Sequence, residues 1–166
     1  LGFGFTYVRS YSNRPPVVGF GGITGSLRAN SPFGGGNATS ANTAGLEFSW
    51  EASPRFALSG WVGATFARDE LVKTNKATIL NYALTFAFPD LLIPGNMGGI
   101  IIGTEPYVLS HSNKAREEDM NFHIEALYRM KINENISITP GIVVLLNPEG
   151  NTQNDPVILG TLRTTF

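Results

Sequence analysis

Residues 122–132, FHIEALYRMKI, alternate between two kinds of side chain with a period of two. One kind is apolar, and the other carries nearly all of the charge. The apolar set is Phe122, Ile124, Ala126, Tyr128, Met130 and Ile132, and the other set is His123, Glu125, Leu127, Arg129 and Lys131. Because successive side chains of a strand point to opposite faces of a sheet, this segment is predicted to be a β-strand with one apolar and one charged face.

The same period recurs along the whole chain and predicts about eight strands. The others are expected at residues 1–11, 46–51, 56–66, 78–88, 98–109, 136–146 and 157–166. Most have the roughly 9 to 11 residues that a tilted strand needs to cross a bilayer. Pro106 and Pro140 lie within or near two of these strands, where each would remove a ladder hydrogen bond, so we expect them at a rim or a bulge.

The connections between the expected strands alternate between long and short. In order along the chain they are residues 12–39, 52–55, 68–76, 89–96, 111–121, 133–135 and 147–156. A transmembrane β-barrel has this layout, with short periplasmic turns and longer outer loops, and its sheet must close because lipid cannot satisfy a free edge. The predicted fold is therefore all-β, an antiparallel up-and-down transmembrane β-barrel with both chain ends on the short-turn side. A soluble β-sandwich also alternates in this way, and it stays open as the alternative.

The composition agrees with a surface that faces lipid and excludes several functions. Charged residues make up 15% of the 166 residues, against about 25% in soluble domains. A formal net charge of -1 gives no basic footprint for nucleic acid, and a chain without cysteine has neither disulfides nor thiolate metal sites. Apolar runs such as GIVVLL are too short for a membrane helix. The start at Leu1, without an initiator methionine or a signal peptide, suggests part of a longer precursor.

Three stretches resemble a known family. Residues 136–166, ISITPGIVVLLNPEGNTQNDPVILGTLRTTF, are similar to the closing hairpin of cyanobacterial outer-membrane porins, which belong with the carbohydrate-selective OprB-type porins. The stretches GLEFSWEASPRFALSGWVGATF and ALTFAFPDLLIPGNMGGIIIGTEPYV are also similar to that family. The resemblance covers roughly residues 40–166 and is specific in combination, because ITPG, NP, ND and GTLRTTF occur in this order.

The resemblance implies a sixteen-stranded homotrimeric barrel with an N-terminal periplasmic domain that grips the cell wall. Residues 1–166 would then be one porin domain, the C-terminal half of the barrel, and the periplasmic domain and earlier strands would lie outside this chain. The implied function is passive diffusion of small hydrophilic solutes, sugars or inorganic ions such as iron, across the outer membrane. No cofactor is expected.

The last strand ends on an aromatic residue. Leu162, Thr164 and Phe166 share one face of an alternating segment. The resemblance implies that such a terminal strand is the address read by the barrel-assembly machinery, with Phe166 as the signal. The alternative is that Phe166 only anchors in an interfacial aromatic girdle, and both roles are compatible.

If the apolar face meets lipid, the charged face lines the lumen and tunes selectivity. The pore-lining candidates are Glu47, Glu51, Asn81, Glu105, Tyr107, His123, Glu125, Arg129, Lys131 and Arg163. The competing interpretation is that these residues form cross-strand salt bridges that only brace the wall. Trp61 could stack on a sugar, although packing or a girdle position is the more common role of tryptophan.

The connection at 12–39 is longer than a loop that only joins two strands, so we expect it to have a role of its own. It could fold inward as a constriction loop, which would make Arg14 and Arg28 important, or pack against a trimer neighbour. A mobile external loop is the equally open alternative.

Other chemistry is not supported. GFGGIT lacks the third glycine of a dinucleotide fingerprint, and NPEGNTQND lacks EF-hand spacing and reads as an Asx-rich turn. The two histidines, His111 and His123, accompany no nucleophile elbow and no metal-ligand pair, so we expect no catalytic residue and no enzyme.

Overall fold

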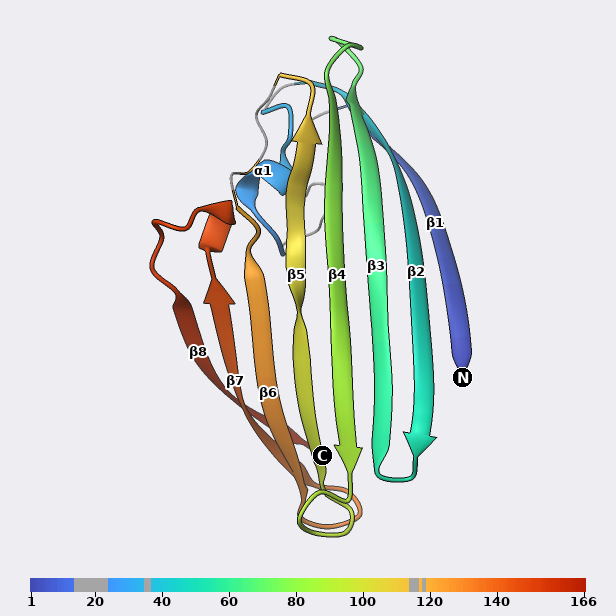
Figure 1. Cartoon of the computed structure of the whole chain (residues 1–166), viewed down its shortest axis with the longest axis vertical. Coiled ribbons are helices and arrows are strands. Elements are labelled where there is room, and N and C mark those ends of the chain that lie inside the picture. Colours follow the sequence, from blue (N-terminus) through green and yellow to red (C-terminus); the bar gives the residue numbers. More distant parts are fainter. Residues whose placement is uncertain (14–23, 35–36, 114–116, 118) are drawn as a thin grey trace.

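The computed structural model describes residues 1–13, 24–34, 37–113, 117 and 119–166. Within them, eight antiparallel strands form one curved sheet whose order follows the sequence (Figure 1). The strands are β1 (Gly2–Ser12), β2 (Thr39–Ser53), β3 (Phe56–Asp69), β4 (Lys76–Pro89), β5 (Met97–His111), β6 (Phe122–Lys131), β7 (Ser137–Leu146) and β8 (Val157–Thr165). The helices are α1 (Leu27–Asn30) and the 3-10 turn η1 (Pro148–Gly150). The predicted all-β, up-and-down fold is confirmed, and the strands form one sheet rather than the two packed sheets of a sandwich.

The register gives the sheet two different faces, because residues paired across antiparallel strands point the same way. One cross-strand row consists of Phe3, Phe48, Gly60, Leu84, Ile102, Ile124, Val144 and Ile158. We call the face that carries this row the apolar face. The next row consists of Gly4, Glu47, Trp61, Ala83, Gly103, His123, Leu145 and Val157. We call its face the mixed face.

Large side chains on the apolar face are left open to the surroundings. Phe3 is 80% exposed, Phe66 54% and Ile158 65%. Such a continuous apolar surface is costly in water and is the expected outside of a membrane barrel. No helix among the described residues has the length and hydropathy required to cross a membrane.

Both chain ends lie on the side of the short turns, as the alternation of long and short connections predicted. Gly2 pairs with Ser49 close to the β2–β3 turn, and Thr165 pairs with Ser137 close to the β6–β7 turn. The connections β1–β2, β5–β6 and β7–β8 are at the opposite end, which we call the long-loop end.

The sheet departs from the predicted pattern in β2. The strand runs from Thr39, seven residues before the predicted start at 46. Its first half, TSANTAG, consists of small or polar residues without alternation. Ala41 of this half is buried with Ala67 and Ala77 beneath Phe33, so a contact from the connection that precedes β2 replaces the missing hydrophobic pattern.

The second departure is a β-bulge around Pro106. Tyr82 pairs with Thr104 and Leu80 pairs with Tyr107, so β5 holds one extra residue between these pairs. A bulge re-aims the side chains beyond it. Tyr107 therefore shares the apolar face with Leu80, and the expectation that it shares the face of Glu105 is wrong. Pro140 lies opposite a gap in the β6–β7 ladder between Leu127 and Met130, near the short-turn rim.

Candidate functional site

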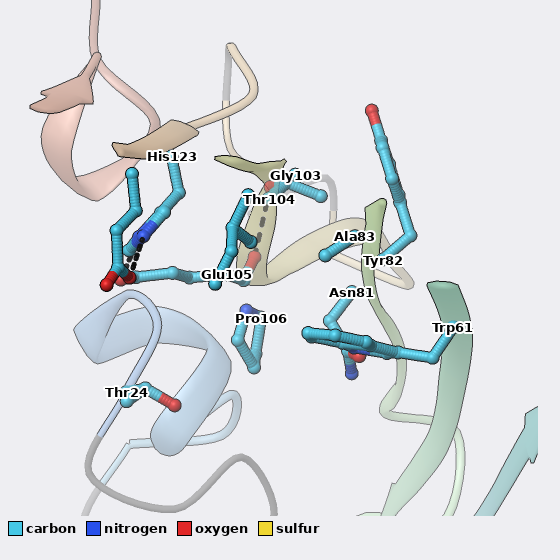
Figure 2. A pocket seen from close by; sticks show the side chains of 12 residues that line it. Thr24, Trp61, Asn81, Tyr82, Ala83, Gly103, Thr104, Glu105, Pro106 and His123 are labelled. Carbon is cyan, nitrogen blue, oxygen red and sulfur yellow. Dashed lines mark hydrogen bonds and ion pairs between the residues drawn. The ribbon is translucent and has the colours of Figure 1, made fainter. Parts of the chain in front are cut away.

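A pocket of about 430 Å³ lies on the mixed face at mid-height of the sheet (Figure 2). Four adjacent strands supply its wall, and residue 24 of the β1–β2 connection lies across it. The polar or aromatic lining residues are Thr24, Trp61, Asn81, Tyr82, Thr104, Glu105, His123 and Glu125. Four of the predicted pore-lining residues are thus gathered in one place.

His123 lies between two carboxylates in this pocket. Its Nδ1 is 3.3 Å from Glu105 Oε1, and its Nε2 is 3.6 Å from Glu125 Oε2. Glu125 follows two residues later on the same face of β6, and the bulge at Pro106 turns Glu105 toward the ring. The three side chains are about a quarter exposed, so the cluster offers carboxylate oxygens to a solute while the imidazole holds them in position.

Glu47 and Trp61 continue the same cross-strand row. The carboxylate of Glu47 lies over Gly4 of β1, where a Cβ atom would be 2.3 Å from Glu47 Oε1. Trp61 is 47% exposed, and Figure 2 shows its indole ring beside Asn81. A half-exposed indole next to amide and carboxylate groups has the composition of a surface that binds a polyhydroxyl solute.

The remaining candidates lie on the mixed face nearer the short-turn end. Glu51 pairs across the strands with Ala57, Arg129 with Met97, and Arg163 with Thr139. Lys131 forms an ion pair with Glu134 in the β6–β7 turn, with Nζ 2.8 Å from Oε1. Acidic residues therefore dominate the middle of this face, and cations gather toward one rim.

Residues 24–34 of the β1–β2 connection cover the mixed face near the long-loop end. The Ser26 N–H donates to the Pro106 carbonyl at 3.0 Å. Ala29 of α1 is buried against Ile79 and Val108, and the ring of Phe33 lies 5.4 Å from that of His111. The segment thus packs on the sheet, as the constriction-loop interpretation requires. Arg28 is exposed on α1, and Arg14 lies outside the described residues.

Two carboxylates that no sequence pattern singles out hold this segment in place. Ser26 donates its hydroxyl to Glu117 Oε1 and accepts from the Ala29 N–H as the cap of α1. Glu149 Oε2 accepts the Leu27 N–H at 2.7 Å. Burial raises the pKa of Glu117, while its hydrogen bond from Ser26 opposes the shift. None of these residues was selected from the sequence; a serine before a short helix is a common N-cap, and this is the one signal that could have pointed to Ser26.

The site contains no arrangement typical of metal binding. Across the part of the chain that the structure describes, no group of three or more His, Cys, Asp or Glu residues could hold a metal ion. The polar groups of the pocket instead lie on four adjacent strands of one face and on Thr24 of the β1–β2 connection.

Comparison with known proteins places the chain in a family. A family model described as carbohydrate-selective porin, OprB family, matches residues 1–166. The uncharacterized protein sll0772 of Synechocystis sp. is 37% identical over 188 aligned residues, which cover 99% of this chain and 33% of that protein. The uncharacterized protein alr4550 of Nostoc sp. is 33% identical over 172 residues, which cover 100% of this chain and 29% of that protein.

The resemblance noted for residues 40–166 is thus confirmed and extends to the whole chain. The chain spans about a third of the length of the curated relatives it matches. No solved structure matches it. Because the family model covers every residue, this chain belongs to the carbohydrate-selective porin, OprB family.

Proposed function

We propose that the chain forms part of the wall of an outer-membrane porin, a water-filled barrel through which small hydrophilic solutes diffuse without an energy source. The observation that carries this proposal is the contrast between the faces of the sheet. The apolar face has no carboxylate at any strand position, whereas the mixed face carries Glu47, Glu105, His123 and Glu125 at mid-height. A wall between lipid on one side and water on the other accounts for this concentration of carboxylates on one face.

Closure of the barrel follows from the same reasoning. β1 and β8 are the two edges of the sheet, and an unpaired edge in lipid leaves backbone N–H and C=O groups without partners. We propose that both edges pair with further strands of the longer protein, in a barrel of about sixteen strands. The relatives are about three times as long as this chain, which leaves room for those strands and for a periplasmic domain that contacts the cell wall.

The solute path runs along the mixed face in this proposal. The carboxylates of the pocket attract cations or accept hydrogen bonds from sugar hydroxyls, and Trp61 provides an apolar surface for a sugar ring. Residues 24–34 narrow the path where they cover β5. The family name favours sugars, and inorganic ions, including iron, are the second class that an acidic wall would pass.

Assembly and partners belong to the same proposal. The barrel would be a homotrimer in the outer membrane, in contact with outer-membrane lipid. The barrel-assembly machinery would read the terminal strand through Phe166, which is 90% exposed beyond the end of β8.

The OprB family is one of porins rather than enzymes, which agrees with the expectation that no catalytic residue is present. The remaining alternative is a soluble binding module. It would have to cover the apolar face with a second layer, and residues 24–34 pack on the mixed face instead.

The test is single-channel conductance of the full-length protein, extracted in detergent and inserted in a planar bilayer. We expect stepwise openings in groups of three and a reversal potential that reports cation preference under a salt gradient. Silence from folded, inserted protein would refute the pore and leave a plugged barrel or a binding module.

A further inference from the structure

Three cations form a cluster on the apolar face at the long-loop end. Arg9 of β1, Arg68 of β3 and Lys76 of β4 are all exposed, and we call them the rim cations. Arg68 pairs directly with Lys76, and Arg9 lies in the row of Phe66 through Asn42. The three side chains border a shallow hollow of about 270 Å³ whose other polar members are Ser40, Asn42 and Thr78.

The height of the rim cations coincides with one boundary of the apolar band. On β3 the apolar-face positions from Phe56 to Phe66 are uncharged, and Arg68 is the next. This span is about 34 Å along the strand at roughly 3.4 Å per residue. A tilt of about 40° reduces it to about 25 Å, the usual height of the lipid-facing band. At the same end of the sheet, Lys76 lies just beyond the uncharged apolar-face positions of β4, which it precedes in the chain, and Arg9 lies just beyond those of β1.

The positive charge of this cluster is poorly balanced. Arg68 and Lys76 are directly opposed on one face, an arrangement that costs stability when nothing lies between the charges. Of the three rim cations, Arg68 has an ion pair with Glu70 among the described residues, with Oε1 3.0 Å from Nη2. Arg9 donates to the neutral Asn42 Oδ1 at 3.3 Å, and no described residue pairs with the Lys76 side chain. The cluster is therefore suited to an anion from outside the chain.

We propose that the rim cations bind the phosphate of an anionic lipid headgroup whose acyl chains lie on the apolar face below. This inference rests on the membrane position given under the proposed function. Arginine guanidinium groups bind phosphate oxygens in bidentate fashion, and lysine adds a point charge. Tyr7 and Tyr11, 57% and 66% exposed beside Arg9, are the aromatic residues expected at the same interface.

Charge complementarity favours lipid over a second copy of the chain at this place. A neighbouring barrel that met the rim cations through its own apolar face would have to offer acidic groups. The strand positions of the apolar face in β1–β8 carry no Asp or Glu, and Glu70 just beyond β3 already pairs with Arg68, so a second such face offers the rim cations no strand carboxylate. A phosphate-bearing lipid supplies both the negative charge and the apolar chains.

The test is native mass spectrometry of the full-length protein in a nonionic detergent, titrated with two lipids of identical acyl chains. The lipids are phosphatidylglycerol and the phosphate-free monogalactosyl diacylglycerol. We expect preferential binding of phosphatidylglycerol and a loss of affinity of at least about tenfold in the triple variant R9Q/R68Q/K76Q. The matched control is R55Q, which removes an exposed cation at the β2–β3 turn, the opposite end of the same strands, and should leave binding unchanged.

The single variant Lys76→Gln is the test to use if the triple variant fails to fold. The Lys76 side chain has no partner among the described residues, so its replacement should leave the fold intact. We expect this variant to bind phosphatidylglycerol about threefold more weakly. Unchanged binding in the variants, equal binding of both lipids, or full displacement by inorganic phosphate would overturn the lipid site. A change of oligomeric mass without a change of lipid binding would also overturn it.

Conductance recorded on the same preparation separates this inference from the pore. Normal channels without lipid preference would refute the lipid site alone. Lipid preference with silent channels would support the lipid site and refute the pore alone.

Discussion

Ser26 and Glu117 are joined by a hydrogen bond across a separation of 91 residues, with the serine hydroxyl as donor and Oε1 of the carboxylate as acceptor. The other carboxylate oxygen, Oε2, is buried and has no partner within the described part of the chain. Glu117 is only 8% exposed. The contact that holds residues 24–34 on the sheet therefore includes a carboxyl group in a poorly solvated position, and it should respond to pH.

The first prediction concerns Glu117→Gln. Because burial raises the pKa of Glu117 above its ordinary 4.5, the folded state binds a proton more readily than the unfolded state does. Docking of residues 24–34 should therefore be strongest below pH 4.5 and weaken as pH rises through the raised pKa. The neutral glutamine removes this dependence. Protease sensitivity of the β1–β2 connection from about pH 4 to about pH 8 measures the effect. An equal slope in both proteins would show that Glu117 is not the titrating group.

The second prediction concerns Ser26→Ala. The variant removes the N-cap of α1 and the hydroxyl donor to Glu117, so docking of the segment should lose about 1 kcal/mol or more. Limited proteolysis of the folded barrel should cut this connection faster, while the melting of the barrel itself changes little. Thr74→Ala, in the exposed β3–β4 turn, is the control and should have the proteolysis rate of the unaltered protein. Equal proteolysis rates for both variants and the unaltered protein would show that Ser26 does not hold the segment on the sheet.

The third prediction tests how tightly β4 and β5 approach. A Cβ atom at Gly103 would lie 2.2 Å from the Tyr82 carbonyl oxygen and 2.7 Å from Ala83 Cα, both of them backbone atoms. Gly103→Ala should therefore destabilise the barrel by about 1–3 kcal/mol or more, because backbone must move. Gly45→Ala is the matched control, since its Cβ atom would be 3.8 Å from the nearest atom. The measurement is the temperature at which the folded gel band converts to the unfolded one, and equal temperatures for both variants would refute this account.

Much of the fold was readable from the sequence because a strand exposes its two faces residue by residue. The charged face of β6 and the apolar face opposite it were assigned correctly from residues 122–132 alone. Tyr107 was assigned to the wrong face because a single extra residue at the Pro106 bulge reverses the alternation of side chains beyond it. The proline in the sequence indicated a rim or a bulge, but it did not show between which residues a bulge would lie.

The sequence left the inward and the external position of the 12–39 connection equally open, and the contacts that dock residues 24–34 could not be predicted. The partners of this segment are Pro106 at the bulge of β5 and Glu117 and Glu149 in two distant connections, and the two connections carry no periodic signal. Local patterns specify strands, whereas the position of a loop depends on contacts that only the assembled sheet brings together.

The last prediction concerns the carboxylates beside His123. In the double variant E105Q/E125Q the pocket loses two negative charges and keeps its size, so attraction of cations to this part of the wall should fall. The attraction between two opposite unit charges about 4 Å apart in water is about 1 kcal/mol, and dissolved salt screens part of this energy. We therefore expect the cation-to-anion permeability ratio to fall by a factor of about two to five, measured as a shift of the reversal potential under a salt gradient. Asp155→Asn, an exposed carboxylate in the β7–β8 connection, is the control and should leave the ratio unchanged. Equal reversal potentials for the double variant and the unaltered protein would place the selective part of the pore elsewhere, even if the channel itself conducts normally.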